Sequence, residues 1–231
     1  MNILKKALCR RNAENFREQM LRLSTLPSAT FVKIGANDGI TNDPCSDLLL
    51  AGTNWKGVLV EPVPFCCERL KKNFCDRSRF VIEQVAVGAT VGERPFYYVD
   101  QSAINSIPSL PEWYDQLGSF SKGHILKHFG SKIEPFIVEA KVEILTLSDI
   151  FGRNNIGEIH LIHIDTEGYD FEILKTLDFT KYRPLIIHIE HKHLSGVDKK
   201  EMVRLLRRNG YSIRNCGEDY YALNKAGSKM I

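Results

Sequence analysis

Features that would point to a membrane or to nucleic acid are missing from the sequence. No apolar run approaches the roughly 20 residues that a membrane-spanning helix needs, and the first residues lack the apolar centre of a secretory signal peptide. Charge of one sign is not in excess, because 31 Lys and Arg stand against 28 Asp and Glu. A nearly neutral chain has no general field that attracts nucleic acid. We therefore expect a cytoplasmic protein that neither spans a membrane nor binds nucleic acid.

Cysteine is present, but not in the patterns of a zinc-binding or disulfide-rich protein. The six cysteines include no CxxC pair, and a chain of 231 residues is far longer than most domains stabilised by disulfides. Cys66 and Cys67 are adjacent, a spacing that suits neither a tetrahedral zinc site nor a disulfide between the two. The sequence therefore predicts reduced and partly buried thiols.

Strand-like and helix-like segments alternate along most of the chain, an order that is typical of a parallel sheet covered by helices. The segment VEILTLSDIF at 142–151 continues this order after a long interruption. His163 and His188 lie inside expected strands and are predicted to be buried core residues. The pattern predicts an α/β fold in which residues 27–231 form one domain. The main expected strands are the apolar, β-branched runs 31–34, 55–60, 79–88, 159–165 and 184–191.

The two ends of the chain carry separate signals. Residues 1–26 combine a rough helical spacing of apolar residues with many basic ones and end before Pro27. They predict an amphipathic helix docked on the domain with its charged face in solvent; contact of that face with an anionic membrane is the alternative. At the other end, segments 211–216 and 219–224 flank a Gly-Glu turn and predict an antiparallel hairpin.

Residues 101–136 interrupt the alternation with Pro, Gly, Ser and aromatic residues over a length that ordinary loops do not reach. We interpret the segment as an insertion or lid that covers an acceptor site. Its rings suit an apolar or sugar-like acceptor, and the alternative is that they pack a small core of the insertion itself. The residues concerned are Trp113, Tyr114, Phe120, His124, His128 and Phe129.

The run FVKIGANDG ends an expected strand with two glycines around a polar turn. Ligands of open α/β sheets lie beyond the carboxyl ends of the strands, and Gly35 and Gly39 allow the backbone to turn tightly and approach one. The GxGxxG fingerprint of dinucleotide-binding proteins is absent, because Asn37 and Ile40 occupy two of its glycine positions. Asn37 and Asp38 instead suit a ligand that bears an ammonium group. A purely structural turn is the alternative.

Glu61 follows the second expected strand, roughly 20 residues after the glycine loop. An acid in this position accepts hydrogen bonds from two ribose hydroxyls, so Glu61 predicts a ligand that contains a nucleoside. Pro62 fixes the turn directly after it. A solvated loop acid is the alternative.

Five stretches, FVKIGANDG, GVLVEP, EQVAVG, LIHIDTEGYDFEIL and PLIIHIEHKHL, occur in this order. With them the chain resembles the FkbM-type methyltransferases, which are class I S-adenosylmethionine-dependent enzymes. The resemblance implies a Rossmann-like sheet of about seven strands, mostly parallel with a C-terminal antiparallel hairpin, and helices on both faces. It also implies S-adenosylmethionine as the cofactor and O-methylation of a hydroxyl on a small molecule, sugar, glycan or natural product.

The resemblance carries over to individual cofactor-binding positions. They comprise the glycine loop, the ribose acid with the proline after it, the end of the third strand beside adenine, and the end of the fourth strand. Lys33 departs from the family, in which many members carry an acid on the first strand. The expected cofactor-binding residues are Gly35, Asn37, Asp38, Gly39, Glu61, Pro62, Gln84, Val85 and Asp165.

Methyl transfer to a hydroxyl needs a group that aligns the acceptor and takes up its proton. Asp165 ends the strand IHLIHID and is expected at the mouth of the crevice as the first catalytic candidate; a helix N-cap is the alternative. Glu190 and His191 end the next strand and are the further candidates. Glu167 is either a further residue of the site or an acid that only stabilises the first turn of the following helix through the helix dipole. These groups could bind a divalent cation, but no metal is expected.

Two other functions are compatible with the pattern. A nicotinamide-dependent oxidoreductase is disfavoured by the missing GxGxxG and by the closing hairpin. A methyltransferase-like protein that binds a ligand or partner without turnover is kept open by Lys33.

Overall fold

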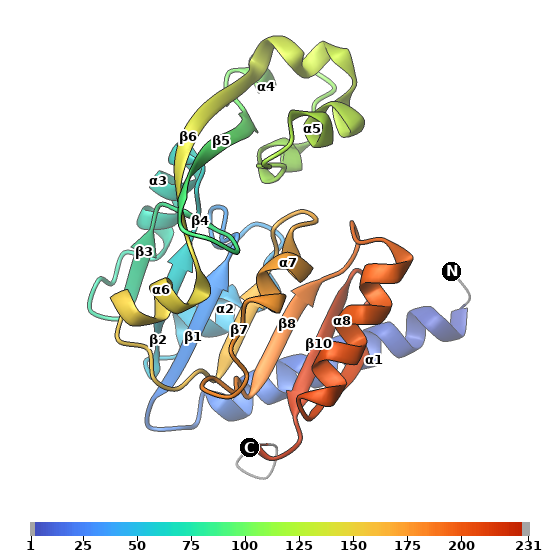
Figure 1. Cartoon of the computed structure of the whole chain (residues 1–231). Coiled ribbons are helices and arrows are strands. Elements are labelled where there is room, and N and C mark those ends of the chain that lie inside the picture. Colours follow the sequence, from blue (N-terminus) through green and yellow to red (C-terminus); the bar gives the residue numbers. More distant parts are fainter. Residues whose placement is uncertain (1–2, 228–231) are drawn as a thin grey trace.

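The computed structural model describes residues 3–227, and its main feature within this range is a sheet of seven strands (Figure 1). The strand order is β3-β2-β1-β7-β8-β10-β9. The first five strands pair in parallel, whereas β10 is antiparallel to both of its neighbours. This arrangement confirms the predicted mostly parallel sheet with a C-terminal hairpin. The strands are β1 Ala29–Ile34, β2 Trp55–Val60, β3 Phe80–Glu83, β7 Leu161–Ile164, β8 Ile186–Glu190, β9 Tyr211–Asn215 and β10 Asp219–Asn224.

The register around β1 brings the ends of three strands to one edge of the sheet. Ile34 lies opposite Val60 of β2 and Ile164 of β7, and all three side chains are buried. The ladder continues one residue further, because the Gly35 amide donates to the Val60 carbonyl at 3.0 Å and the Asp165 amide donates to the Ile34 carbonyl at 3.0 Å. The carboxyl ends of these strands therefore form the edge at which open α/β sheets bind ligands.

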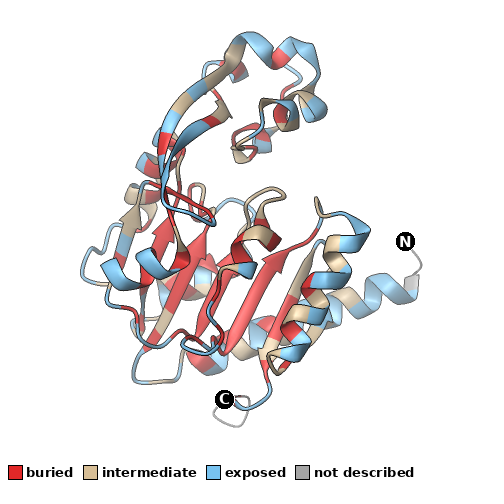
Figure 2. Ribbon diagram, viewed as in Figure 1, coloured by how far each residue is buried: buried red, intermediate tan, exposed pale blue. Residues whose placement is uncertain are grey.

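Helices cover both faces of the sheet, as predicted (Figures 1 and 2). Phe31 packs in one core with residues of α1, α2 and α3, and its neighbour Val32 packs in the other core with residues of α6, α7 and α8. Successive side chains of a strand point to opposite faces, so the inner strands β2, β1, β7, β8 and β10 contribute to both cores. The helices are α1 Ile3–Leu23, α2 Ser46–Ala51, α3 Pro64–Asn73, α6 Leu147–Arg153, α7 Asp170–Lys175 and α8 Gly196–Arg208.

Only the second half of α1 is buried against the sheet. Phe16, Met20 and Leu23 are buried, with the Phe16 ring 4.5 Å from the His188 ring between centroids. Leu4 and Leu8, which share the same expected apolar stripe, are 76% and 57% exposed. The helix thus docks through its last turns, while its first turns extend past the domain (Figure 1).

A second, three-stranded sheet of order β4-β6-β5 rises from the main sheet and carries four short helical segments (Figure 1). Strands β5 and β6 form a long antiparallel ribbon in which Gly92 pairs with Ile144 and Val99 pairs with Ile137. We refer to residues 92–145, from the start of β5 to the end of β6, as the insertion. Its elements and β4 are β4 Ala86–Val87, β5 Gly92–Val99, α4 Ala103–Ser106, η1 Glu112–Gln116, α5 Lys122–Phe129, η2 Ser131–Phe136 and β6 Ile137–Leu145.

The segment 142–151 contains the end of a strand and the start of a helix, as the resumed alternation predicts, but the strand belongs to the second sheet. Residues 142–145 complete β6, which pairs with β4 and β5 in the second sheet, and α6 follows. The insertion also has a core of its own, in which Tyr114, Leu117 and Ile125 are buried. Buried and exposed residues alternate toward the end of β6, a pattern of strands with one face in solvent. The strands of the main sheet, covered on both faces, are buried almost throughout.

The state of the cysteines and the burial of two histidines agree with the sequence analysis. All six cysteines, which lie within residues 3–227, are free, and Cys45, Cys66 and Cys67 are buried. His163 and His188 are buried too, as predicted. No helix within residues 3–227 is both long enough and apolar enough to cross a bilayer.

Candidate active site

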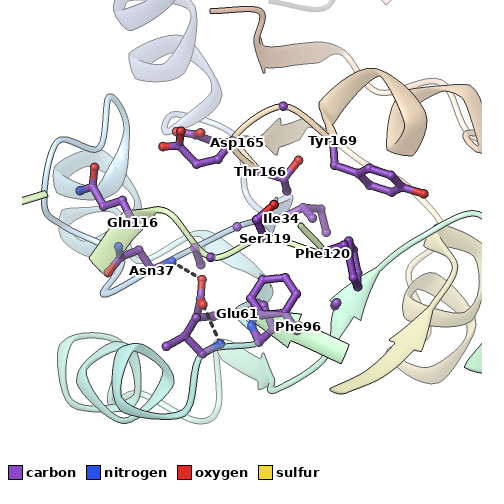
Figure 3. Close-up of a pocket in the computed structure, with 18 of the residues that line it drawn as sticks. Ile34, Asn37, Glu61, Phe96, Gln116, Ser119, Phe120, Asp165, Thr166 and Tyr169 are labelled. Atoms are coloured by element: carbon purple, nitrogen blue, oxygen red, sulfur yellow. Dashed lines mark hydrogen bonds between the residues drawn. The ribbon is translucent and has the colours of Figure 1, made fainter. Parts of the chain in front are cut away.

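A cavity of about 560 Å³ lies between the carboxyl ends of β1, β2 and β7 and the insertion (Figure 3). The structure thus brings together residues that are far apart in the sequence, from the glycine loop to the loop after β7. On the sheet side the predicted site residues that line it are Gly35, Asn37, Glu61, Pro62, Val85 and Asp165. On the other side the insertion contributes Gln116, Ser119, Phe120, Ser121, His124 and His128.

The two glycines of the loop serve the packing of the sheet. Gly35 has φ +74°, and a Cβ there would lie 1.7 Å from the backbone oxygen of Asp165. Gly39 has φ +82°, and its Cβ would meet the side chains of Leu70 and Phe74 at 2.6 and 2.5 Å. Both positions therefore require glycine because another part of the chain is close, in addition to the left-handed backbone. Gly35 still lines the cavity, whereas Gly39 faces α3 and does not.

Asp38 stabilises the loop and does not line the cavity. Its carboxylate accepts hydrogen bonds from the amides of Ile40 at 2.9 Å and Thr41 at 2.8 Å, and from the Thr41 hydroxyl at 2.6 Å. Burial disfavours the charged carboxylate, but these hydrogen bonds outweigh it and hold the pKa of Asp38 below its ordinary value. The predicted contact of Asp38 with a ligand ammonium group is not supported by this position.

Glu61 is buried at the cavity wall between two backbone donors (Figure 3). Its Oε2 accepts from the Asn37 amide at 2.8 Å, and its Oε1 accepts from the Val63 amide at 2.8 Å. Burial raises the pKa of Glu61 to about 7 even though these two hydrogen bonds favour the charged form. Because a carboxylate oxygen has two lone pairs, each oxygen keeps one for a further donor.

Of the two residues predicted to lie beside adenine, only Val85 lines the cavity. Val85 is buried and lines the cavity together with Ala86 and Val87. Gln84 is exposed and does not line it. Both residues lie between β3 and β4, outside the regular strands, and only the Val85 side chain turns inward.

Lys33 lies at the cavity wall in a buried ion pair that the sequence analysis missed. Its ammonium group contacts the Asp43 carboxylate and lies 3.3 Å from Nδ1 of His163. Burial lowers the pKa of Lys33, while the surrounding acidic groups oppose this effect. A lysine inside a central strand signals a buried partner, because an unpaired charge is too costly there. The identity of Asp43 as that partner depends on the fold.

Asp165 joins a cluster of buried carboxyl groups after β7 and β8. Oxygens of Asp165, Asp170 and Glu190 lie within 4.8 Å of one another, so the expected proximity of Asp165 and Glu190 is met. Burial, followed by the repulsion of Asp170 and Glu167, raises the pKa of Asp165 to about 8. Asp170 holds the loop, since its carboxylate accepts from the amides of Thr166 at 2.8 Å and Gly168 at 2.9 Å. The cap-like role considered for Asp165 thus falls to Asp170.

The other two catalytic candidates do not line the cavity. Glu190 is buried behind Asp165, and burial with the neighbouring carboxyl groups raises its pKa to about 10. Its Oε2 has no hydrogen-bond partner among residues 3–227. His191 turns toward the hairpin, with Nε2 3.1 Å from the Asn215 amide nitrogen and its ring 4.0 Å from the Tyr220 ring between centroids. Of the three candidates, the cavity therefore exposes Asp165 alone.

The aromatic residues of the insertion divide between its core and the cavity. Tyr114 is buried in that core and Phe129 packs against it, as the alternative interpretation expected, whereas Trp113 stacks on Phe129 from outside and is 40% exposed. Phe120 lines the cavity with Phe96 and Tyr169, whose rings lie 5.2 and 5.5 Å from its own (Figure 3). Neither Phe96 nor Tyr169 was singled out from the sequence, because only the fold brings their rings next to Phe120.

A family model and several solved structures match the chain. The model described as Methyltransferase FkbM domain matches residues 33–213. Precorrin-6y C5,15-methyltransferase from Geobacter metallireducens GS-15 shares 10% identity over 90% of this chain and 85% of that chain, with a TM-score of 0.43. Fibrillarin from Aeropyrum pernix, in complex with natively bound S-adenosyl-L-methionine, shares 11% identity over 90% and 72%, with a TM-score of 0.39. A search of curated proteins found no match.

Proposed function

The chain belongs to the FkbM family of S-adenosylmethionine-dependent methyltransferases, and from this premise we propose that it methylates a hydroxyl of a sugar, glycan or natural-product acceptor. Its main sheet is the sheet of the class I enzymes. The observation that carries the proposal is Glu61, a buried carboxylate whose two oxygens are oriented by backbone amides at the cavity wall.

Glu61 suits the ribose of the cofactor because each of its oxygens still has a lone pair that can accept a hydrogen bond from a ribose hydroxyl. The Asn37 and Val63 amides hold the carboxylate still, so the cost of ordering it on binding is already met. Val85 and Pro62 give the same end of the cavity an apolar surface for adenine. Lys33 and Asp43 provide a cation and an anion for the amino-acid end. These contacts support S-adenosylmethionine over a dinucleotide.

Asp165 is the residue that we assign to the acceptor. S-adenosylmethionine supplies an electrophilic methyl group on a sulfonium. The acceptor oxygen takes the methyl group, S-adenosylhomocysteine leaves, and the hydroxyl proton passes to the Asp165 carboxylate. A carboxyl group whose pKa is raised to about 8 is a stronger base than an ordinary aspartate once it is ionised. The positive charge of a bound sulfonium favours that ionised form.

The part of the insertion that lines the cavity supports an acceptor site. Phe120 and Tyr169 offer apolar faces, and Gln116, Ser119 and Ser121 offer hydrogen bonds, a combination that suits a sugar ring or a polar natural product. We propose that residues 101–136 cover this acceptor and determine its identity.

Binding and turnover test the proposal separately. Calorimetry is expected to give micromolar-range affinity for S-adenosylmethionine and S-adenosylhomocysteine; tighter binding of NAD would favour the oxidoreductase alternative. Incubation with methyl-labelled S-adenosylmethionine and a panel of hydroxyl-bearing acceptors, read by mass spectrometry, is expected to give a methyl ether. Cofactor binding without transfer to any acceptor would support the alternative of a protein that binds without turnover.

A further inference from the structure

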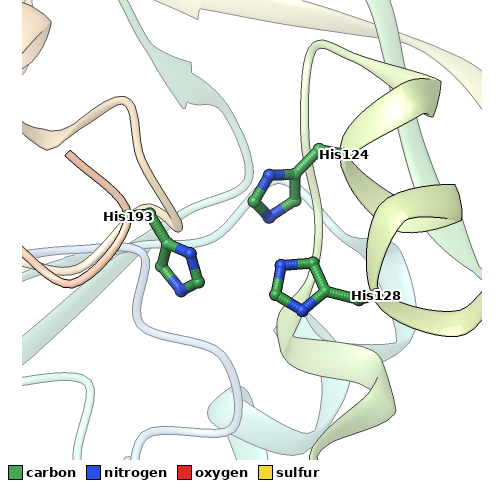
Figure 4. A group of neighbouring side chains, drawn as sticks. All are labelled: His124, His128 and His193. Carbon is green, nitrogen blue, oxygen red and sulfur yellow. The ribbon is translucent and has the colours of Figure 1, made fainter. Parts of the chain in front are cut away.

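Three histidines from two parts of the fold meet at the mouth of the cavity (Figure 4). His124 and His128 are four residues apart on α5 and therefore lie on one face of that helix. His193 follows β8 in the main domain. The ring centroids are 4.9 Å apart for His124 and His128, 5.5 Å for His124 and His193, and 5.4 Å for His128 and His193. Each ring thus faces the other two.

The spacing of the ring nitrogens suits a metal ion. One nitrogen from each ring lies within 4.8 Å of the other two. Zn–N bonds of about 2.0–2.1 Å place two nitrogens of a tetrahedral site about 3.3 Å apart, so modest rotations of the rings close the site. Nε2 of His124 is buried and has no hydrogen-bond partner within residues 3–227.

Glu167 supplies the negative charge that a divalent ion needs. Its Oε2 lies 2.9 Å from Nε2 of His193. A carboxylate that holds one nitrogen of a histidine orients the ring and increases its basicity at the other nitrogen. Lys127 and Lys192 are the cations close to the rings, so Glu167 is needed to balance them.

We propose that His124, His128 and His193, with Glu167 beside them, bind a divalent transition-metal ion of the Zn²⁺ class. Imidazole nitrogens favour such ions, whereas Mg²⁺ and Ca²⁺ prefer oxygen ligands. Because α5 belongs to the insertion and His193 to the main domain, the ion cross-links the two and holds the insertion over the cavity. The site is independent of the acceptor and of the proposed methyl transfer. It was not expected from the sequence, in which His193 is more than sixty residues from the α5 pair.

Metal titration of the full chain, purified without a histidine tag and stripped with a chelator, tests the site. Zn²⁺ is expected to bind one equivalent, and Co²⁺ to give the absorption bands of a tetrahedral nitrogen site. Mg²⁺ should bind far more weakly. His128→Asn and His193→Asn should each lower Zn²⁺ affinity at least tenfold, in the range that lost metal-site contacts produce. Lys122→Ala is the matched control on α5, because its ammonium group pairs with Glu134 at 2.9 Å and not with the rings; its affinity should match the wild type.

Hydrogen exchange tests the cross-link itself. Zn²⁺ is expected to slow amide exchange in residues 122–129 of the wild type and of Lys122→Ala, but not of His193→Asn. Zn²⁺ that binds no more tightly than Mg²⁺, or that binds both histidine variants as tightly as the wild type, would overturn the site. Binding without slower exchange in α5 would overturn the cross-link. Should a histidine variant lose the wild-type circular dichroism spectrum, Glu167→Gln decides, since it keeps the three rings and should still weaken Zn²⁺ binding several-fold.

Discussion

The main sheet and the insertion hold their parts of the cavity in different ways. Asn37 and Glu61 follow adjacent parallel strands, and a backbone-to-carboxylate hydrogen bond of 2.8 Å joins them. Phe120 reaches the same cavity from a ribbon with its own sheet and its own small core. Strand register and close packing fix the positions of the site residues on the main sheet. The positions of the site residues on the insertion depend on where the insertion lies relative to that sheet. We infer that the cofactor side is rigid and the acceptor side adjustable, and five predictions test this difference.

The largest effect is expected from a glycine of the sheet side. Gly35→Val places a Cβ 1.7 Å from the Asp165 carbonyl at φ +74°, so we expect loss of the folded protein. Gly123→Ala in α5 is the counterpart in the insertion, where the nearest atom would be 3.5 Å away; helix propensity there should raise stability by up to about 1 kcal/mol. Thermal unfolding followed by circular dichroism measures both. A folded Gly35→Val protein that merely fails to bind cofactor would show that the glycine serves the ligand.

Removal of the insertion's outer part should abolish turnover and preserve the main domain. Val99 and Ile137 are paired across the ribbon, so a short Gly-Ser turn can replace residues 101–136 without moving β5 or β6. We expect S-adenosylmethionine affinity within a few-fold of the wild type, because Glu61 and the glycine loop remain, and no methyl transfer. Calorimetry and the labelled-methyl assay on the same protein read the two effects. Loss of fold would instead make this segment a structural cap of the sheet.

Asp165→Asn should separate catalysis from cofactor binding on the sheet side. Loss of a general base typically lowers the rate by about 10²–10⁴, while the amide keeps the size of the side chain at the cavity wall. We expect kcat to fall in this range and the cofactor Kd to change far less. His191→Asn is the control, because His191 faces the hairpin and does not line the cavity. A variant with near-normal turnover would transfer the role to the neighbouring Glu190.

Glu61→Ala should weaken cofactor binding at least tenfold. The change removes two hydrogen bonds from ribose hydroxyls to a charged group, each of about 1.5–3 kcal/mol. It also leaves the Asn37 and Val63 amides without their acceptor. Glu61→Gln keeps the shape and one acceptor oxygen and should lose less. An unchanged dissociation constant for S-adenosylhomocysteine would reject the assignment of the ribose site.

The smallest effect concerns the pH dependence of folding without cofactor. The pKa of Glu61 is about 7 in the folded protein against an ordinary 4.5, so the folded state holds this proton more tightly than the unfolded state. The stabilising contribution is complete below about pH 4.5 and is lost as the pH rises through about 7, a difference on the order of 2–3 kcal/mol. Asp115 strengthens the shift, and Arg69 opposes it.

Urea unfolding at pH 5 and pH 8 isolates this group when the wild type is compared with Glu61→Gln. The wild type is expected to lose more stability between the two pH values than the variant, which cannot titrate at this position. Other buried carboxyl groups, such as Asp165, contribute equally to both proteins and cancel. Parallel pH profiles for the two proteins would contradict the raised pKa.

The main sheet was predictable because its strands carry local signals. Runs such as those that became β1, β7 and β8 are apolar on both faces, bounded by turn residues and ordered with helices between them. The sheet that residues 142–145 join was not predictable, because periodicity shows that a strand exists but not which sheet it joins. β6 pairs with β5, which lies about forty residues earlier in the chain, and the alternation of strands and helices does not predict this pairing.

The location of the site was predictable in the same way, but the contacts of several of its residues were not. Glu61 and Asp165 were found because chain order alone brings the ends of parallel strands to one edge. Asp38 and Gly39 were assigned to a ligand, yet the Asp38 carboxylate accepts hydrogen bonds within its own loop and Gly39 packs against α3. Asp43 and the three histidines were missed as partners because each interacts with a residue distant in sequence. Side-chain direction, rather than element type, is what the sequence left undetermined.

The buried pair of Lys33 and Asp43 has a consequence for how this protein can evolve. Removing one partner leaves an unpaired charge in the interior at a cost of about 3–5 kcal/mol, a large part of the stability of a typical domain. Neither residue can therefore be replaced alone without a loss of stability. Related sequences should inherit the two positions as a unit, so an acid at position 33 should coincide with the loss of the acid at position 43.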